Sequence, residues 1–221
     1  MEWVHQYQVF LFDLDGLLVN TEELHFEAYR KMCSDRGFDL DWDFATYCQA
    51  AHINCAMLRE KICEKLPGLQ EFQWEELYQE KKDALEQIMR NGSIELMPGV
   101  EQLLEVLESA NIKRSVVTHS SDQHVSLIRE KNPVLDTIPT WFTRETYTHP
   151  KPHPEGYQKA IDALANPEDQ VIGFEDTPKG LRSLLGTRAK PVMVTKVRYP
   201  ETSEFLEKGI LWVDDLAAVS M

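Results

Sequence analysis

The stretch Val9-Phe10-Leu11-Phe12-Asp13-Leu14-Asp15-Gly16 decides the fold class. Its first four residues form an apolar run that predicts a buried strand, and the acids and glycine that follow mark the strand's end and a turn. Further predicted strands and helices alternate after it, with strands at 115–117, 170–174 and 191–194 and helices at 100–107, 120–131, 155–165 and 178–185. This alternation is typical of an α/β domain with a mainly parallel sheet covered on both faces.

A long purely helical segment interrupts this pattern. Three helical runs are expected there, from Glu22 to Arg36, from about Asn54 to before Pro67, and through Trp74 to a stop at Gly92. About seventy residues without a strand indicate a separate unit inserted after the first strand. We therefore predict a core domain of residues 1–19 and 96–221, and an inserted all-helical domain of residues 20–95.

The composition indicates an acidic globular protein. The 221 residues carry 23 Lys and Arg against 37 Asp and Glu, a formal charge of −14, and 43% of them are hydrophobic, which is enough to form a core. Because binding to a phosphate backbone needs a basic stripe, this balance argues against nucleic acid as a partner. Oligomeric state is left open between a monomer and a small homo-oligomer.

Membrane and secretory roles are not expected. The apolar run 9–19 contains two aspartates and is too short to span a bilayer, and the N-terminus lacks the basic start of a signal peptide. The four cysteines, Cys33, Cys48, Cys55 and Cys63, contain no CxxC pair. We interpret them as small buried apolar residues of a protein in the reducing cytoplasm.

Polar residues follow several of the predicted strands, where the ligands of open parallel sheets bind. Asp13 and Asp15 follow the first strand, Thr118 a later one, and Glu175 and Asp176 another. Four converging carboxylates repel one another unless a cation offsets their charge, and an all-oxygen ligand set favours Mg²⁺.

A basic residue at the same edge makes this site suited to a phosphoryl group. Lys151 lies in the loop 148–154, whose three prolines restrict the backbone. Positive charge from Lys151 and a metal, with the Thr118 hydroxyl, is what a phosphoryl group requires. Asp13 is ionised at neutral pH and is the expected nucleophile, and Asp15 the expected general acid and base.

In their order along the chain, the segment 12–16, Thr118, Lys151 and the Glu175-Asp176 pair resemble the four motifs of the haloacid dehalogenase-like superfamily. The helical insertion resembles the cap of the subfamily that contains β-phosphoglucomutase and phosphosugar phosphatases. The resemblance implies a Rossmann-like core with a cap, and an aspartyl-phosphate on Asp13. It also implies that Thr118 and Lys151 hold the phosphate.

The resemblance further implies that Mg²⁺ is bound by Asp13, the main-chain carbonyl of Asp15, and Asp176, with Glu175 in or just behind the ligand shell. In the inserted domain, it places His25 at a hinge, and Lys81 is a candidate for contacting substrate. The expected function is therefore a Mg²⁺-dependent phosphatase acting on a small phosphorylated, sugar phosphate-like metabolite.

Three other functions stay open. A phosphosugar mutase is one alternative, although the segment 49–55 has Ala51 and Asn54 where the mutase would have glycine and arginine. A phosphoacceptor receiver domain uses similar residues but has no room for the helical insertion. A non-catalytic binding or regulatory protein with this fold is the third. His149 and His153 are four residues apart, but their proline-rich loop argues against the helical geometry of a two-histidine metal site.

Overall fold

A computed structural model describes residues 1–220, which form two compact units. The first unit comprises residues 1–20 and the chain from Glu95 on, and the second comprises Thr21–Ile94. Each unit has its own core and is described by itself below. No helix in the described residues is long and apolar enough to cross a membrane.

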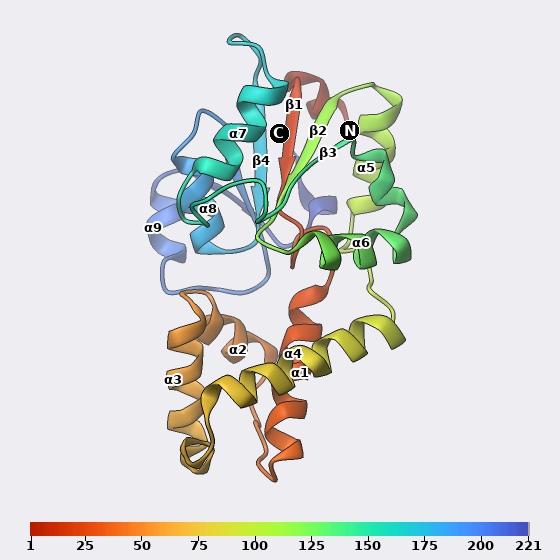
Figure 1. The fold of residues 1–221 in the computed structure, drawn as a ribbon. Helices are drawn as coiled ribbons and strands as arrows, with labels where there is room; N and C mark the ends of the chain where they lie inside the picture. The colour runs from red at the N-terminus through yellow and green to blue at the C-terminus, as the bar shows by residue number, and fades with distance from the viewer. Residues whose placement is uncertain (221) are drawn as a thin grey trace. The chain divides into compact units, whose positions relative to one another are not determined.

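The first unit is built on a six-stranded sheet in the order β3-β2-β1-β4-β5-β6 (Figure 1). Its strands are β1 (Val9–Phe12), β2 (Lys113–Val117), β3 (Thr140–Phe142), β4 (Val171–Glu175), β5 (Lys190–Val194) and β6 (Leu211–Val213). Every neighbouring pair is parallel. The predicted α/β class with a mainly parallel sheet is confirmed. The two edge strands were not predicted, because three residues are too few to show a periodic pattern.

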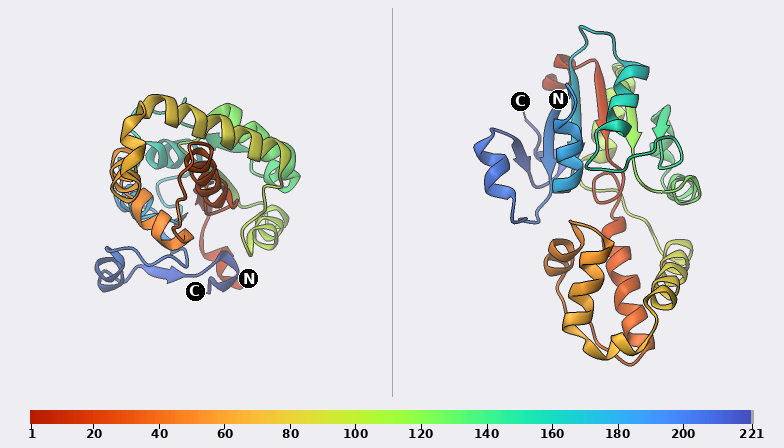
Figure 2. Two further views of the ribbon diagram at one scale, coloured as in Figure 1. Left: turned by 90° about the horizontal axis from the view of Figure 1, so that it is seen from below. Right: turned by 60° about the vertical axis from the view of Figure 1, so that its left-hand side comes forward.

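Helices cover both faces of this sheet (Figure 2). They are α5 (Val100–Ser109), α6 (Asp122–Lys131), α7 (Glu155–Leu164), α8 (Pro178–Leu185) and α9 (Thr202–Glu207), with 3-10 turns η1 (Glu2–Gln6), η3 (Pro133–Thr137) and η4 (Leu216–Ala218). The strand order runs outward from β1 in one direction through β2 and β3 and in the other through β4 and β5. Because parallel crossovers are right-handed, α5 and α6 belong to one face and α7 and α8 to the other. The order reverses between β1 and β4.

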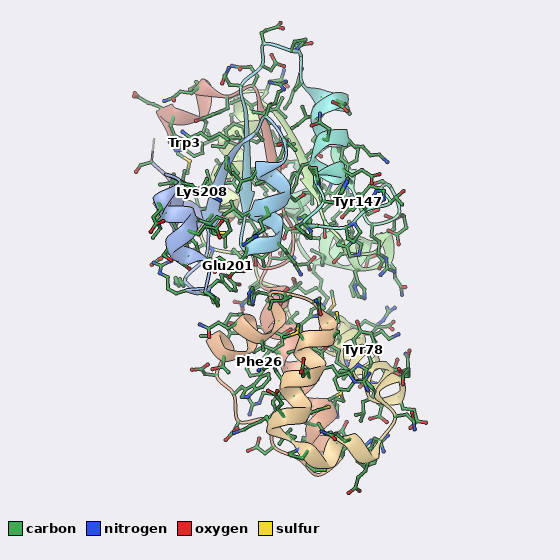
Figure 3. All side chains as sticks on the ribbon, turned by 90° about the vertical axis from the view of Figure 1, so that its left-hand side faces the viewer. Trp3, Phe26, Tyr78, Tyr147, Glu201 and Lys208 are labelled. Carbon is green, nitrogen blue, oxygen red and sulfur yellow. The ribbon has the colours of Figure 1, made fainter. Side chains whose placement is uncertain are left out.

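Alternation of side chains along β1 supplies two separate cores. Val9 and Leu11 pack with Tyr157 and Leu184 of α7 and α8. The side chains between them point to the opposite face, where Phe12 stacks on Phe174 of β4 with ring centroids 5.3 Å apart. The Trp3 ring of η1, labelled in Figure 3, covers this aromatic group. Full burial of such side chains stabilises the fold by about 1.5–3 kcal/mol each.

The second unit consists only of helices in the described structure. They are α1 (Thr21–Asp35), α2 (Phe44–Ala51), α3 (Cys55–Lys65) and α4 (Trp74–Asn91), with the 3-10 turn η2 (Pro67–Glu71). Helices α1 and α4 pack along each other. Phe26 of α1, labelled in Figure 3, stacks on Tyr47 of α2 with ring centroids 4.9 Å apart. Asn54 caps α3 by accepting a 2.9 Å hydrogen bond from Met57 N.

Two sequence-based expectations were wrong. The helix predicted at 120–131 begins two residues later, at Asp122, because Ser121 caps α6 by accepting a hydrogen bond from the His124 amide, and Ser120 therefore lies outside the helix. The cysteines are not uniformly buried either: Cys33 and Cys48 are buried, whereas Cys55 is exposed and Cys63 is half-buried. Cys55 is exposed because it begins α3, directly after the Asn54 cap.

Candidate active site

Three carboxylates meet where the strand order reverses. Asp13 directly follows β1, Glu175 ends β4, and Asp176 comes next, so that the neighbouring strands carry all three to one edge of the sheet. Each offers a carboxylate oxygen within 4.8 Å of the other two, and all three residues are buried. The convergence expected for these residues is therefore present, in the crevice where open α/β sheets bind ligands.

Lys151 joins this cluster from the loop before α7. Its ammonium contacts Asp13 Oδ1, lies 2.6 Å from Glu175 Oε1 and donates a 2.9 Å hydrogen bond to Val117 O. Burial alone would lower the pKa of Lys151, but the carboxylates of Asp13 and Glu175 outweigh it and the net pKa is raised. Lys151 is therefore a permanent cation in a pocket where its side chain is only 8% exposed.

One ammonium does not neutralise the cluster. Burial raises the pKa of Asp13, Lys151 lowers it in part, and the charges of Glu175 and Asp15 raise it again. The net direction is upward, which means that the ionised carboxylate lacks sufficient positive charge nearby. A cation next to Asp13 would supply that charge and restore the nucleophilic, ionised form.

Glu175 is held by a buried tyrosine and a glycine. The Tyr157 hydroxyl donates a 2.6 Å hydrogen bond to Glu175 Oε1, the same oxygen that faces Lys151. On the other side, the carboxylate lies against Gly180 of α8, where an added Cβ would be 1.9 Å from Glu175 Oε2. The carboxylate is thus fixed in position by groups from two helices.

Asp15 belongs to a neighbouring hydrogen-bonded group. Its Oδ2 accepts hydrogen bonds from Thr118 Oγ1 at 3.1 Å and from Ser120 Oγ at 2.6 Å. Thr118 Oγ1 in turn accepts from the Ser120 amide at 3.0 Å. The Asp15 carboxylate is outside the three-carboxylate group. The metal contact predicted for Asp15 is the one through its main-chain carbonyl, and it stays a prediction. The phosphate-binding role of Thr118 and Lys151 stays a prediction.

The donor set fits a hard divalent cation. Three carboxylates face one ammonium, every candidate ligand is an oxygen, and within residues 1–220 the buried Glu175 Oε2 makes no hydrogen bond. Buried carboxylates in such numbers are stable when a cation is among them. Among biological ions, Mg²⁺ matches an all-oxygen site built on carboxylates.

Comparison with known proteins identifies the family. The model of the haloacid dehalogenase-like hydrolases matches residues 10–194. The chain belongs to this family. A protein of Saccharomyces cerevisiae named as a probable pseudouridine-5'-phosphatase is 31% identical over 209 residues, covering 89% of this chain and 84% of that one. A Thermotoga maritima protein named phosphorylated carbohydrates phosphatase is 27% identical over 184 residues, covering 78% of each chain.

The fold is shared with solved members of the haloacid dehalogenase-like family. A β-phosphoglucomutase from Clostridium difficile superposes with a TM-score of 0.70 at 24% identity, covering 97% of this chain and 94% of that one. The predicted resemblance, the Rossmann-like fold and the assignment to the hydrolases are confirmed.

Ser120, Tyr157 and Gly180 were not predicted as site residues of this haloacid dehalogenase-like hydrolase. Ser120 comes two residues after Thr118, and this spacing was its only signal in the sequence. Tyr157 and Gly180 lie on helices that were predicted correctly, but a helical pattern shows which residues are buried and not which carboxylate they touch.

The two predicted substrate residues of the helical unit lie side by side. His25 of α1 and Lys81 of α4 are joined by a 2.9 Å contact between His25 Nδ1 and Lys81 Nζ. Lys81 is 3% exposed, and burial lowers its pKa to about 8 despite the nearby Glu22. Their role toward substrate, like the assignment of residues 20–95 as a cap, stays a prediction.

Proposed function

We propose that this chain is a Mg²⁺-dependent phosphatase that hydrolyses a small phosphorylated, sugar phosphate-like metabolite through an aspartyl-phosphate on Asp13. The observation that carries this proposal is the meeting of Asp13, Lys151, Glu175 and Asp176 at the reversal of strand order. The names of two relatives, the Thermotoga phosphorylated carbohydrates phosphatase and the yeast probable pseudouridine-5'-phosphatase, support the reaction and the substrate class.

In the first half of the reaction, a carboxylate oxygen of Asp13 attacks phosphorus. The bond from phosphorus to the ester oxygen breaks, and that oxygen takes a proton from the Asp15 carboxyl as the alcohol leaves. Lys151 holds positive charge beside Asp13, where the phosphoryl oxygens gain negative charge. Thr118 contributes a hydroxyl at the same edge, next to Asp15.

In the second half, the acyl phosphate on Asp13 is hydrolysed. The Asp15 carboxylate removes a proton from a water molecule as that water attacks phosphorus. Inorganic phosphate leaves, the Asp13 carboxylate is restored, and Asp15 again carries the proton that it gave to the leaving group. The hydroxyls of Thr118 and Ser120 keep the Asp15 side chain in one orientation through both steps.

The metal site is assigned to Asp13, Asp176 and the main-chain carbonyl of Asp15, with Glu175 in or behind the ligand shell. When bound there, Mg²⁺ supplies positive charge that offsets the carboxylates and the developing charge on the phosphoryl group. The residues of the chain provide the complementary part: Lys151 and Tyr157 fix Glu175, and the turn after β1 fixes Asp13 and Asp15.

The decisive experiment is phosphate release from a panel of phosphorylated sugars and nucleotides, with Mg²⁺ or with excess chelator. Asp13→Asn should lower the rate by at least about a thousandfold, because the amide is not a nucleophile. Asp162→Asn, an exposed exchange of the same type on α7, is the matched control and should behave as wild type. Near-wild-type turnover by Asp13→Asn would exclude the proposed mechanism.

The same panel separates hydrolysis from the alternatives. A mutase would isomerise a hexose 1-phosphate without net phosphate release, whereas the proposed enzyme liberates phosphate. A non-catalytic protein would show no turnover with any member of the panel. The phosphatase names of the relatives favour hydrolysis over both.

A further inference from the structure

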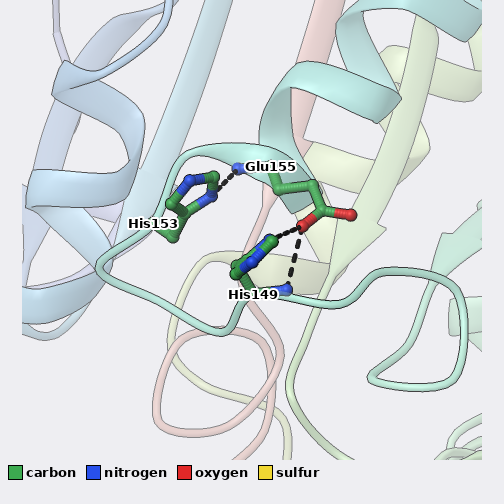
Figure 4. A group of neighbouring side chains, drawn as sticks. All are labelled: His149, His153 and Glu155. Atoms are coloured by element: carbon green, nitrogen blue, oxygen red, sulfur yellow. Dashed lines mark hydrogen bonds and ion pairs between the residues drawn. The ribbon is translucent and has the colours of Figure 1, made fainter.

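A second group of metal-ligating side chains lies on the loop that carries Lys151. His149, His153 and Glu155 each offer one donor atom, and the three atoms lie within 4.8 Å of one another (Figure 4). The two imidazole rings are 4.7 Å apart between centroids. Sequence spacing argued against a helical two-histidine site, but the loop brings the rings together by folding back before α7.

We propose that His149, His153 and Glu155 form a binding site for one transition-metal ion of the Zn²⁺ class, separate from the oxygen-only cluster around Asp13. Two imidazoles and one carboxylate are a ligand set that Zn²⁺ and neighbouring transition metals prefer. Mg²⁺ prefers oxygen ligands, so the two sites select different ions. A water molecule would complete a four-coordinate shell.

The loop presents these residues on a restrained backbone. Every second residue from 150 to 154 is a proline, so that a proline follows His149 and others flank His153. In addition, the main-chain oxygen of His153 accepts a 2.7 Å hydrogen bond from the Ser183 hydroxyl of α8. Fewer conformations of the free loop mean that less entropy is lost when an ion is bound.

Glu155 has a structural role that leaves the histidine pair unexplained. Its carboxylate accepts hydrogen bonds from the amides of Thr148 at 3.0 Å and His149 at 2.9 Å, which secures the loop to the start of α7. Neither imidazole is needed for that purpose. Yet His149 Nδ1 lies 2.6 Å from Glu155 Oε2, and His153 Nδ1 accepts from the Glu155 amide at 3.2 Å.

Binding needs only a local adjustment. Donor atoms around a tetrahedral Zn²⁺ lie about 3.3 Å apart, given Zn–N distances of about 2.0–2.1 Å. The 63% exposed side chain of His149 has room to turn toward an ion, and in doing so it would give up its 2.6 Å contact with Glu155 Oε2. The ion takes the place of the hydrogen between His149 Nδ1 and Glu155 Oε2: a neutral imidazole then carries its proton on Nε2, and an imidazolium releases one proton to solvent. The ion also replaces the 3.2 Å contact of His153 Nδ1 with the Glu155 amide.

Equilibrium dialysis against Zn²⁺, with Mg²⁺ in large excess to occupy the oxygen cluster, tests the proposal. Wild type should bind one Zn²⁺ per chain, and its affinity for this ion should fall at least about tenfold in His149→Ala and in His153→Ala. His5→Ala, an exposed histidine of η1, is the matched control and should bind as wild type. Unchanged Zn²⁺ affinity in both loop variants, or displacement of the ion by Mg²⁺, would overturn the site.

A footprint on the unaltered protein covers the case in which a variant does not fold. Zn²⁺ should protect His149 and His153 from acylation by diethyl pyrocarbonate, mapped by mass spectrometry, while His5 stays reactive. Equal modification of His149 and His153 with and without Zn²⁺ would also overturn the proposal.

Discussion

The carboxylate of Glu175 occupies the space in which a side chain at Gly180 would begin. A Cβ at Gly180 would lie 1.9 Å from Glu175 Oε2 and 2.0 Å from Cδ, so no residue but glycine leaves that carboxylate in place. Gly180→Ala should therefore push Glu175 away from Lys151 and Asp13. We expect a loss of about 1–3 kcal/mol in the free energy of unfolding, together with a strong loss of Mg²⁺-dependent phosphate release.

Gly173→Ala separates crowding from displacement of the carboxylate. Gly173 lies on β4, the strand that ends at Glu175. A Cβ added to Gly173 would be 2.4 Å from Leu184 Cδ2, an apolar group outside the site. Urea denaturation should show both variants destabilised, and a phosphate assay should show the larger loss for Gly180→Ala. Equal losses of activity in Gly180→Ala and Gly173→Ala would mean that displacement of the Glu175 carboxylate is not the cause of the loss.

Tyr157→Phe should weaken the hold on Glu175 without changing the shape of the core. Burial raises the pKa of Tyr157, so the hydroxyl keeps its proton and donates to Glu175 Oε1. Its removal from a fully buried site should destabilise the fold by about 1–3 kcal/mol. The Mg²⁺ concentration that gives half-maximal phosphate release should rise about tenfold, because the residues behind a metal ligand set its orientation.

Tyr147→Phe is the control for this change. The Tyr147 hydroxyl donates at 2.8 Å to the main-chain oxygen of Thr118, a neutral acceptor, and does not touch Glu175. It should cost about 0.5–1.5 kcal/mol of stability and leave the Mg²⁺ dependence unchanged. A Mg²⁺ titration that is identical for wild type and Tyr157→Phe would contradict the role given to Tyr157.

Ser120→Ala should impair Asp15 as an acid. The Ser120 hydroxyl makes the shorter of the two hydrogen bonds to Asp15 Oδ2, at 2.6 Å. Without it, we expect phosphate release from an alkyl phosphate to fall about tenfold, because a displaced acid protonates the leaving oxygen less well. An aryl phosphate, whose leaving group needs little protonation, should lose less, and the ratio of the two rates measures the effect.

Ser121→Ala, at the following residue, is the control for Ser120→Ala. Ser121 caps α6 through the His124 amide and makes no contact with Asp15 among the hydrogen bonds described. It should lower stability by about 0.5–2 kcal/mol while the ratio of alkyl to aryl rates stays that of wild type. A ratio that shifts in Ser121→Ala but not in Ser120→Ala would refute the assignment.

The backbone pattern of this chain could be predicted where apolar periodicity is strong. The run 9–12 and the helix starting at Thr177-Pro178 were located correctly, since a buried strand and a capped helix each have a local signature. β3 and β6 have three residues each and depend on their pairing partners, and the six-residue α9 depends on the burial of Phe205; a local pattern reveals neither.

The site could be predicted as far as residues follow strand ends. Asp13, Glu175 and Asp176 come together because parallel strands end at one edge, which is a property of the fold class. The support given by Tyr157 depends instead on which turn of α7 faces β4, and that of Gly180 on how closely α8 approaches. Both are settled by packing between distant segments, which sequence spacing does not encode.

The buried ammonium of Lys81 should make the stability of the fold depend on pH. Burial lowers the pKa of Lys81 to about 8 in the folded protein, while in the unfolded chain a lysine titrates near its ordinary value of about 10.4. Below pH 8, both states carry the proton and the folded state bears the full penalty of a buried charge. Between pH 8 and 10, the unfolded state binds more protons, so this group makes the protein more stable as pH rises.

Lys81→Met removes this contribution. Urea denaturation at pH 7 and pH 9.5 should show that the variant's advantage in free energy of unfolding, relative to wild type, shrinks at the higher pH. Lys82→Met, its exposed neighbour on α4, should show no such change. A difference between wild type and Lys81→Met that stays constant from pH 7 to 9.5 would mean that Lys81 keeps an ordinary pKa, and that its 2.9 Å contact with His25 is made by an ammonium at every pH tested.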